Sequence, residues 1–216
     1  MEYKQKKRYC TVYIVRHGET ELNVKRVIQG QTDSPLTKLG EKQARERGNN
    51  LSHINFDAVY SSDLLRAKRT AEIILLEKKL AVSTTKALRE RAFGRFEGKT
   101  FEEYGHLLQK ELEELRLLDE KSQFSHKLHP DIESDEEIVG RFITFLREVS
   151  IANTGKTVLV VSHGGIMRAF LIHLGWGTAR DIDFGSIHNL AYAKVECDGV
   201  EFAVKETEGI EKVKLK

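Results

Sequence analysis

Two histidines in this sequence lie just beyond runs of largely apolar residues. Arg16-His17 ends the run 11–15, and His163 follows the run 157–161. Such runs predict strands, and side chains at the carboxyl ends of strands in open α/β sheets face a crevice where active sites lie. Neutral imidazole is a nucleophile near pH 7, and a guanidinium offers bidentate contacts to phosphate oxygens. The pair therefore suggests a histidine nucleophile, His17, beside a phosphate anchor, Arg16.

Either histidine alone has a simpler interpretation, as a surface residue or as a buried core residue. Gly164 and Gly165 follow His163, and glycines let a backbone approach a ligand closely. The helix expected to begin there would direct its N–H groups and positive dipole end towards an anion. Arg66 falls in the first turn of another expected helix, after the run 57–61, where a guanidinium can contact phosphate. These features together predict an anion site at one edge of the sheet.

Glu90 stands between two arginines, after the expected strand 81–85 and before a loop marked by Gly94 and Gly98. A surface network of salt bridges would explain this charge pattern. A carboxyl group at that place is also suited to be a positioned acid, because general acid catalysis needs a proton donor beside the leaving oxygen. The residues alone leave both interpretations open.

Short apolar runs alternate with longer amphipathic stretches along the chain, which predicts an α/β layer fold. The expected strands cover residues 11–15, 57–61, about 81–85, 157–162, 190–196 and 200–204. The last two are separated by an Asp-Gly pair at 198–199, which is a strong signal for a tight turn. We therefore expect an antiparallel hairpin at a sheet edge and a mixed sheet.

Three expected helices begin at residues that can cap them. These are Thr37 before 38–51, Asp63 before 64 to about 76, and Ser134 with Glu137 before a pattern that reaches 149. Between residues 100 and 133 a helical repeat of apolar residues is followed by a polar stretch, which predicts a helical insert and a loop. A segment longer than ordinary connections is often a lid or a substrate wall. A helix that only covers one end of the sheet is an equally good interpretation.

Composition narrows the class of protein. The 216 residues are 40% apolar, and 35 basic against 33 acidic residues leave a formal charge of +2, which does not call for nucleic acid or a membrane as partner. Cys10 and Cys197 show no metal-ligand spacing, so neither a disulfide framework nor a zinc site is predicted. We expect a cytoplasmic protein whose basic residues 1–9 form a solvated tail, because the next apolar run is too short for a signal peptide.

The segments RHGETELN, SSDLLRAKRTA, LRERAFGRFEG and SHGG occur in this order between residues 16 and 165. They resemble the histidine phosphatase superfamily, in the branch that includes cofactor-dependent phosphoglycerate mutases and fructose-2,6-bisphosphatases. The resemblance runs from about residue 11 to 174. It implies a three-layer α/β/α sandwich with a mostly parallel six-stranded sheet, one antiparallel edge strand and a helical insert over the active site, in a single domain of residues 1–216.

The resemblance also implies roles for individual residues. His17 would accept the phosphoryl group, Glu90 would donate a proton, and His163 would be the third catalytic residue and bind phosphoryl oxygens. The implied substrate-binding residues are Arg16, Asn23, Gln29, Gly30, Arg66 and Gly164. Neither a metal ion nor a cofactor is expected, because the positive charge around His17 can stabilise the transferring phosphoryl group.

Phosphatases and mutases of this family share that chemistry, so the surrounding residues must distinguish them. Related mutases have a tyrosine where Phe93 stands and a lysine where Phe101 stands, while the pattern closing at Thr100 looks more like the phosphatases. We therefore expect a metal-independent phosphomonoesterase for a small phosphorylated metabolite, as a monomer or homodimer. The alternatives are a phosphoglycerate mutase, a non-catalytic binder of phosphorylated ligands and a phosphatase of protein phosphohistidine. Ile132 replaces a glycine of many relatives, so no substrate contact is inferred for its loop.

Overall fold

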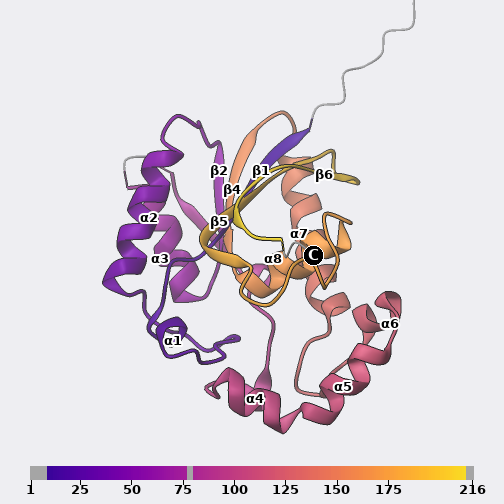
Figure 1. The fold of residues 1–216 in the computed structure, drawn as a ribbon. Coiled ribbons are helices and arrows are strands. Elements are labelled where there is room, and N and C mark those ends of the chain that lie inside the picture. Colours follow the sequence, from indigo (N-terminus) through magenta and orange to yellow (C-terminus); the bar gives the residue numbers. More distant parts are fainter. Residues whose placement is uncertain (1–8, 77–79, 213–216) are drawn as a thin grey trace, which may run out of the picture.

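A six-stranded sheet forms the centre of the computed structural model, which describes residues 9–76 and 80–212 (Figure 1). In spatial order the strands are β3 (Val82–Thr85), β2 (Ala58–Ser62), β4 (Thr157–Ser162), β1 (Cys10–Arg16), β5 (Ile187–Cys197) and β6 (Phe202–Ile210). Neighbouring strands are parallel from β3 to β1, and β5 is antiparallel to both β1 and β6. The predicted α/β class with a mixed sheet is confirmed, and β6 lies outside the antiparallel strand β5 at the edge.

Helices cover both faces of the sheet, and side chains along β1 alternate between these faces. The covering helices are α2 (Lys38–Asn50), α3 (Leu65–Ile74), α7 (Asp135–Ala152) and α8 (Gly164–His173). Val12 and Ile14 pack in the core under α7 and α8, whereas Tyr13 and Val15 pack in the core under α2 and α3. Because both faces are buried, the strand is a continuous apolar run in the sequence. The predicted three layers are thereby confirmed.

The helices begin at the predicted caps with one exception. Thr37 caps α2, and Ser134 with Glu137 forms the capping box of α7. Asp63 does not cap α3, because a leucine takes the N-cap position and the carboxylate of Asp63 binds Arg89 through two N–O contacts of 2.7 Å. Short helical turns also occur at α1 (Glu21–Val24), η1 (Lys86–Leu88) and η2 (Gly94–Phe96). Within the described residues, the helices are all too short or too polar to cross a membrane.

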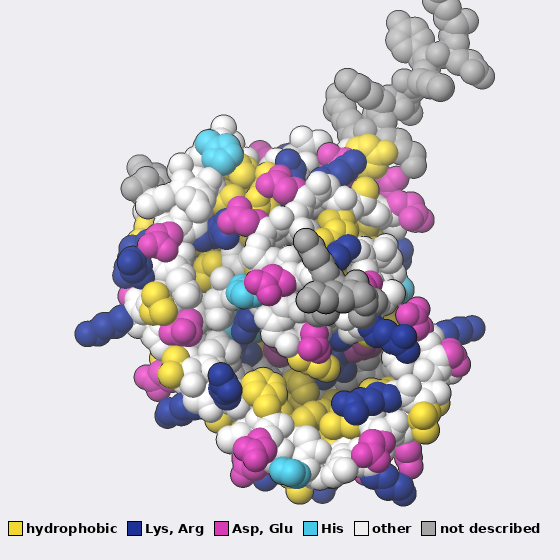
Figure 2. Space-filling model, viewed as in Figure 1, with side chains coloured by type: hydrophobic (Ala, Val, Ile, Leu, Met, Phe, Trp, Pro, Cys, Tyr) yellow, Lys and Arg dark blue, Asp and Glu magenta, His cyan; other side chains and the backbone are white. Residues whose placement is uncertain are grey.

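The predicted insert forms a rim of short helices, at the bottom of Figure 1. They are α4 (Phe101–Leu107), α5 (Gln109–Leu117) and α6 (Glu120–Ser125). Helix α6 lies in the polar stretch expected to be a loop, where Asp119 caps it by accepting a hydrogen bond from a backbone N–H. The rim packs on a small core formed by Phe96, Leu108 and Ile132. Figure 2 shows apolar side chains in the hollow above the rim, so the insert forms a wall of this hollow.

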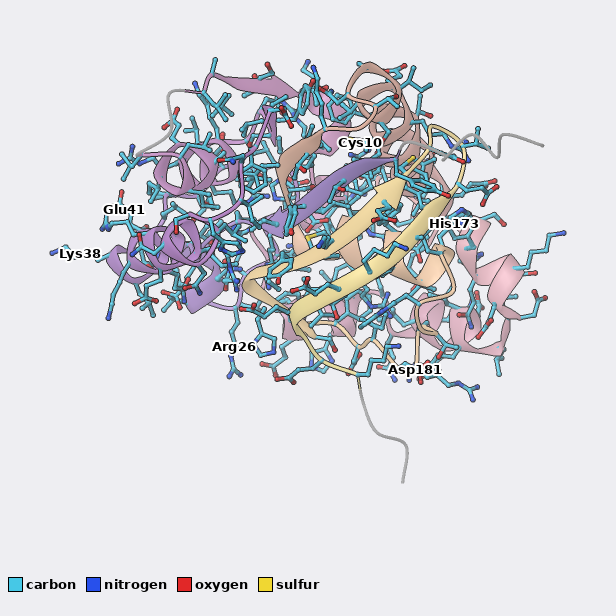
Figure 3. The ribbon with its side chains drawn as sticks, turned by 90° about the horizontal axis from the view of Figure 1, so that it is seen from above. Cys10, Arg26, Lys38, Glu41, His173 and Asp181 are labelled. Carbon is cyan, nitrogen blue, oxygen red and sulfur yellow. The ribbon has the colours of Figure 1, made fainter. Side chains whose placement is uncertain are left out.

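The C-terminal hairpin is longer than its apolar pattern indicates. The strands expected at 190–196 and 200–204 extend over the full lengths of β5 and β6. Strand β6 is largely exposed, so its outer part is polar and carries little strand signal. The Asp-Gly turn is confirmed, and Gly199 supplies the left-handed conformation with φ 96°. Figure 3 shows the hairpin beside β1, where Cys10 is paired in register with Cys197 and both are free thiols.

Candidate active site

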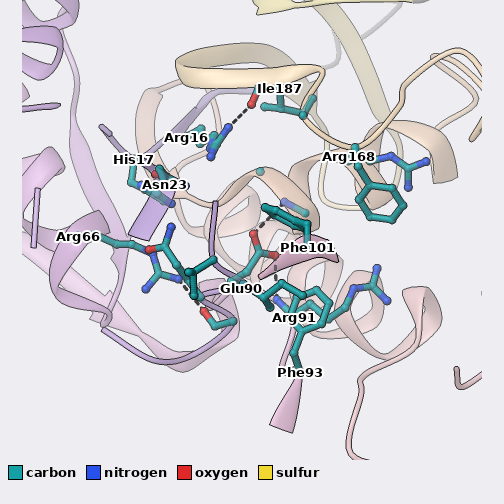
Figure 4. A pocket seen from close by; sticks show the side chains of 18 residues that line it. Arg16, His17, Asn23, Arg66, Glu90, Arg91, Phe93, Phe101, Arg168 and Ile187 are labelled. Atoms are coloured by element: carbon teal, nitrogen blue, oxygen red, sulfur yellow. Dashed lines mark hydrogen bonds between the residues drawn. The ribbon is translucent and has the colours of Figure 1, made fainter. Parts of the chain in front are cut away.

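A cavity of about 470 Å³ opens at the carboxyl ends of β1 and β4 (Figure 4). Because parallel strands end at the same edge of a sheet, the segments after several strands meet there. Eight of the predicted site residues line the cavity: Arg16, His17, Asn23, Gln29, Gly30, Arg66, Glu90 and Gly164. The ninth, His163, packs against the ring of His17, with ring centroids 5.2 Å apart. The fold therefore brings together motifs that are widely separated in the sequence.

His17 follows β1 directly and is buried, with 3% of its surface exposed. Its Nδ1 lies 2.7 Å from the carbonyl oxygen of Gly18, so Nδ1–H is the donor and Nε2 keeps its lone pair. Burial lowers the pKa of His17 well below 6.5, and the charges of Arg66 and Arg16 lower it further. The ring is therefore neutral near pH 7, with Nε2 available as a nucleophile.

Several buried nitrogen atoms beside His17 have no hydrogen-bond partner among the described residues. They are Nε of Arg16, Nε of Arg66 and both ring nitrogens of His163. Burial, and then the charge of Arg66, lowers the pKa of His163 well below 6.5, so this ring is also neutral. Buried polar groups are normally paired. A neutral imidazole has one N–H donor, so a ligand with several acceptor oxygens, such as a phosphoryl group, would satisfy the two arginine Nε–H groups and the one N–H of His163.

Main-chain carbonyl groups fix both arginines. Arg66, in the first turn of α3, donates from Nη1 to the oxygen of Thr32 at 2.8 Å and from Nη2 to that of Gly30 at 2.6 Å. Arg16, at the end of β1, donates to the carbonyl oxygen of Ile187 at the start of β5. Burial lowers the pKa of Arg66 to about 10, so the guanidinium stays charged at neutral pH. Two fixed cations thus lie beside His17.

Glu90 occupies the helix N-terminus that we expected to face a bound anion. Its Oε2 accepts a hydrogen bond from Gly165 N at 2.9 Å, and its Oε1 accepts from Ile166 N at 3.1 Å and Arg91 N at 2.8 Å. The N–H groups of Gly165 and Ile166, in the first turn of α8, therefore bind a carboxylate of the chain itself, whereas we expected the N–H groups at this helix start to face a bound anion. A Cβ at Gly165 would lie 2.5 Å from Glu90 Oε1, so this glycine makes room for the carboxylate.

The remaining predicted residues form the cavity wall next to α1. The amide oxygen of Asn23 accepts a hydrogen bond from the backbone N–H of Thr20 at 3.2 Å, and that of Gln29 accepts one from the Thr20 hydroxyl at 3.0 Å. Their amide N–H groups are therefore the ends suited to a ligand. Gly30 adopts a left-handed conformation with φ 53°, and a Cβ there would collide with the side chain of Glu97.

Comparison with known proteins adds independent evidence. A model of the histidine phosphatase superfamily (branch 1) matches residues 12–208. The chain belongs to the histidine phosphatase superfamily. The resemblance inferred from the four sequence motifs is thereby confirmed.

Relatives of this histidine phosphatase carry both phosphatase and mutase names. The chain is 35% identical over 166 residues to the uncharacterized phosphatase PhoE of Bacillus subtilis, covering 77% of this chain and 78% of the relative. It is 39% identical over 153 residues to the probable phosphoglycerate mutase GpmB of Salmonella arizonae, covering 71% and 69%. The solved structure of Bacillus stearothermophilus YhfR matches with a TM-score of 0.79 at 30% identity, over 93% and 97% of the two chains. These matches also support the fold.

Sequence reasoning missed one side of the cavity of this histidine phosphatase. Arg168 of α8 and Phe184 line it, and the guanidinium carbon lies 4.5 Å from the centre of the Phe184 ring. Arg168 also donates to the carbonyl oxygens of Ile182 at 2.6 Å and Ala179 at 3.0 Å, which holds the loop before β5 at the cavity. Arg168 lies one helical turn after Gly164, and this spacing is the signal that identifies it. Phe184 lies in an irregular loop without such a signal.

Proposed function

We propose that this histidine phosphatase hydrolyses phosphomonoesters through a phosphohistidine at His17. Nε2 of His17 attacks phosphorus and forms a P–N bond while the bond to the ester oxygen breaks, and Glu90 gives its proton to that oxygen. Glu90 then takes a proton from water, which attacks phosphorus and breaks the P–N bond. The products are the alcohol, inorganic phosphate and neutral His17. Arg16, Arg66 and His163 bind the phosphoryl oxygens during both steps.

The observation that best supports this function is the group of unpaired nitrogen donors on Arg16, Arg66 and His163 next to a neutral His17 whose Nε2 carries the lone pair. Phosphoryl transfer depends mainly on positioning and on stabilising the charge of the phosphoryl oxygens. Two fixed guanidinium groups supply that stabilisation within the chain. The proposal therefore includes activity without an added metal ion, with Asn23 and Gly164 as further contacts of the substrate.

The alcohol part of the substrate would lie against an apolar wall. Phe93, Phe101 and Phe184 line the cavity, and residues Phe101 and Phe184 are 60% and 71% exposed. Tyrosine and lysine at the positions of Phe93 and Phe101 hold phosphoglycerate in the mutases that the sequence resembles. We therefore propose small phosphorylated metabolites as substrates, with preference for esters of apolar alcohols. Gln29 and Gly30 would contact the same part of the substrate.

The proposal extends to the chain as a whole. Since the family match spans residues 12–208, we propose a single catalytic domain of residues 1–216. Free thiols at Cys10 and Cys197 are compatible with a cytoplasmic location. We propose a monomer or a homodimer, for which the exposed edge strand β6 offers a pairing surface.

Two assays test the reaction type. Release of phosphate from para-nitrophenyl phosphate should continue at an undiminished rate in EDTA, and wild-type protein without turnover would contradict the phosphatase proposal. For the mutase alternative, conversion of 3-phosphoglycerate to 2-phosphoglycerate is measured with added 2,3-bisphosphoglycerate. We expect hydrolysis to dominate, and rapid interconversion would favour the mutase instead.

A further inference from the structure

The main chain around Glu90 lies mostly outside regular secondary structure. It follows the single 3-10 turn η1 and continues without helix or strand through residues 89–93. Carbonyl groups in such a segment have no ladder to bond to, so other groups must satisfy them. The position of the Glu90 carboxyl group therefore depends on what holds this segment.

Arg141, on α7, binds two carbonyl groups of this segment and one of the turn η1 before it. Its Nη1 donates to the oxygens of Ala87 at 2.9 Å and Arg89 at 2.7 Å, and its Nη2 donates to the oxygen of Glu90 at 3.0 Å. A planar guanidinium with five N–H donors suits this arrangement, whereas an ammonium group is a single point of contact. One side chain thus fixes the main chain of Glu90 and of the residues before it.

Glu133 links Arg141 to Ala92, the second residue after Glu90. Its two carboxylate oxygens accept from Nε of Arg141 at 3.1 Å and Nη2 at 3.0 Å, and Oε2 also accepts from the backbone N–H of Ala92 at 2.8 Å. The backbone N–H of Glu133 donates to the oxygen of Ala92 at 3.1 Å. The ion pair is only 21% and 23% exposed. The two side chains therefore hold the segment on both sides of Glu90.

We propose that Arg141 and Glu133 are positioning residues that keep Glu90 within reach of the leaving oxygen. Neither Arg141 nor Glu133 is among the described residues that line the cavity, so both act through the main chain and do not touch the substrate. The N-terminus of α8 holds the carboxylate of Glu90, and the Arg141–Glu133 pair holds its backbone. A misplacement of about 1 Å can lower a rate roughly 100-fold. The inference rests on the proposed function, in which Glu90 is the proton donor.

Substitution of Arg141→Lys tests this role, because lysine keeps the charge and loses the fork. The measured quantity is kcat/KM for glycerol 1-phosphate divided by kcat/KM for para-nitrophenyl phosphate. Both values report the phosphorylation of the enzyme, and only the alkyl ester, with its poor leaving group, needs a proton donor. We expect the ratio to fall about tenfold or more, within the range that general acid catalysis contributes.

A matched control lies on the same helix. Arg147 donates from Nε and Nη2 to the carbonyl oxygen of Val200 at 3.1 and 2.9 Å, on the exposed side of α7. Arg147→Lys should leave the ratio unchanged. If Arg141 only stabilises the fold, Arg141→Lys lowers both kcat/KM values by the same factor, and this result would overturn the inference.

Glu90→Gln, measured in parallel, separates the inference from the function on which it rests. It should lower the same ratio more than Arg141→Lys does, and the double variant should show no further decrease. A ratio that falls in Glu90→Gln but not in Arg141→Lys refutes the positioning role alone. A ratio unchanged in Glu90→Gln refutes the acid role of Glu90, and the positioning role with it.

Discussion

The reactive nitrogen of His17 is selected by its immediate neighbour. The carbonyl oxygen of Gly18 takes the Nδ1 proton, which leaves the lone pair on Nε2. Burial and two adjacent guanidinium groups lower the pKa of His17. The same positive charges that would bind phosphate therefore also keep the nucleophile unprotonated, and Arg16 contributes to both effects.

This environment predicts the acid side of the pH–rate profile. Because the pKa of His17 is well below 6.5, the nucleophile remains unprotonated as the pH falls through that value. We expect kcat/KM for para-nitrophenyl phosphate, corrected for ionisation of the substrate, to stay level across pH 6.5. A decrease with an apparent pKa near 6.5 would show that His17 has an ordinary, solvated ring.

Gly165 supplies a test of the position of Glu90. Gly165→Ala places a Cβ 2.5 Å from Glu90 Oε1, so the carboxylate must leave the N-terminus of α8. We expect kcat/KM for an alkyl phosphate to fall about 100-fold. Gly140→Ala, at an exposed position of α7, is the control, because no atom outside the backbone of its own helix lies within 4 Å of the added Cβ among the described residues. It should raise the free energy of unfolding by about 1 kcal/mol and leave activity intact.

The residues of the site were predictable where a motif follows a strand end, but their partners were not. His17 and His163 each come directly after a strand, and this placement indicates the sheet edge that they share. Glu90 binds the backbone of Gly165, which lies 75 positions further along the chain. Local spacing carries no information on such a contact, so the helix N-terminus was assigned to the substrate.

At the scale of elements, the rim of α4, α5 and α6 contributes to the cavity mainly through its beginning. Phe101, the first residue of α4, lines the cavity. Phe124, in α6, instead stacks on His173 of α8 with ring centroids 5.2 Å apart. The insert thus lines the cavity at one end and packs on α8 at the other, and its role as a substrate wall stays a prediction.

The wall predicts a selective effect on substrates. Phe101→Ala should lower kcat/KM for naphthyl phosphate about tenfold while glycerol phosphate is affected little, because burying an apolar side chain contributes roughly 1.5–3 kcal/mol. Leu117→Ala, in the same rim, is the control, since Leu117 is 86% exposed. Equal losses for both substrates would indicate that Phe101 supports the fold and does not contact the alcohol.

Capping residues predicted the helix starts correctly where the capping side chain has no stronger partner than the N–H groups of the first turn. Thr37 and Ser134 cap their helices because the N–H groups of the first turn are the nearest donors. Asp63 has a stronger partner in Arg89, whose guanidinium makes two charged hydrogen bonds and lowers the pKa of the Asp63 carboxyl. That arginine follows β3, and its proximity exists only in the folded sheet.

At the scale of the whole molecule, burial of two neutral histidines makes the free energy of unfolding depend on pH. His17 and His163 have pKa values well below 6.5 in the folded chain, whereas the unfolded chain binds protons near 6.5. The unfolded state therefore gains protons first, and stability falls as the pH drops below 6.5. One unit below that value, each histidine costs up to about 1.4 kcal/mol.

Urea unfolding at about pH 7.5 and pH 5.5 measures this dependence. His17→Gln removes one of the two groups, so this variant should lose less free energy of unfolding on acidification than the wild type. Carboxylate titrations contribute equally to both proteins and cancel in the comparison. An identical acid loss in the two proteins would mean that His17 binds a proton in the folded state.

The order of the strands was not predictable from the sequence, although their existence was. Strand β1 lies between β4 and β5, which come much later in the chain, and this placement joins the segments of His17 and His163. The order depends on which side chains, far apart in the sequence, are buried together on the two faces of the sheet. The outer half of β6 was missed because an exposed edge strand needs few apolar residues.

The central claim is the covalent phosphohistidine at His17. The most direct measurement is rapid quenching of the enzyme mixed with a substrate that carries labelled phosphate, followed by mapping of the label. We predict an acid-labile, alkali-stable label on the peptide that contains His17, and neither label nor turnover in His17→Ala. Turnover that persists in His17→Ala, or a label on another residue, would contradict the account.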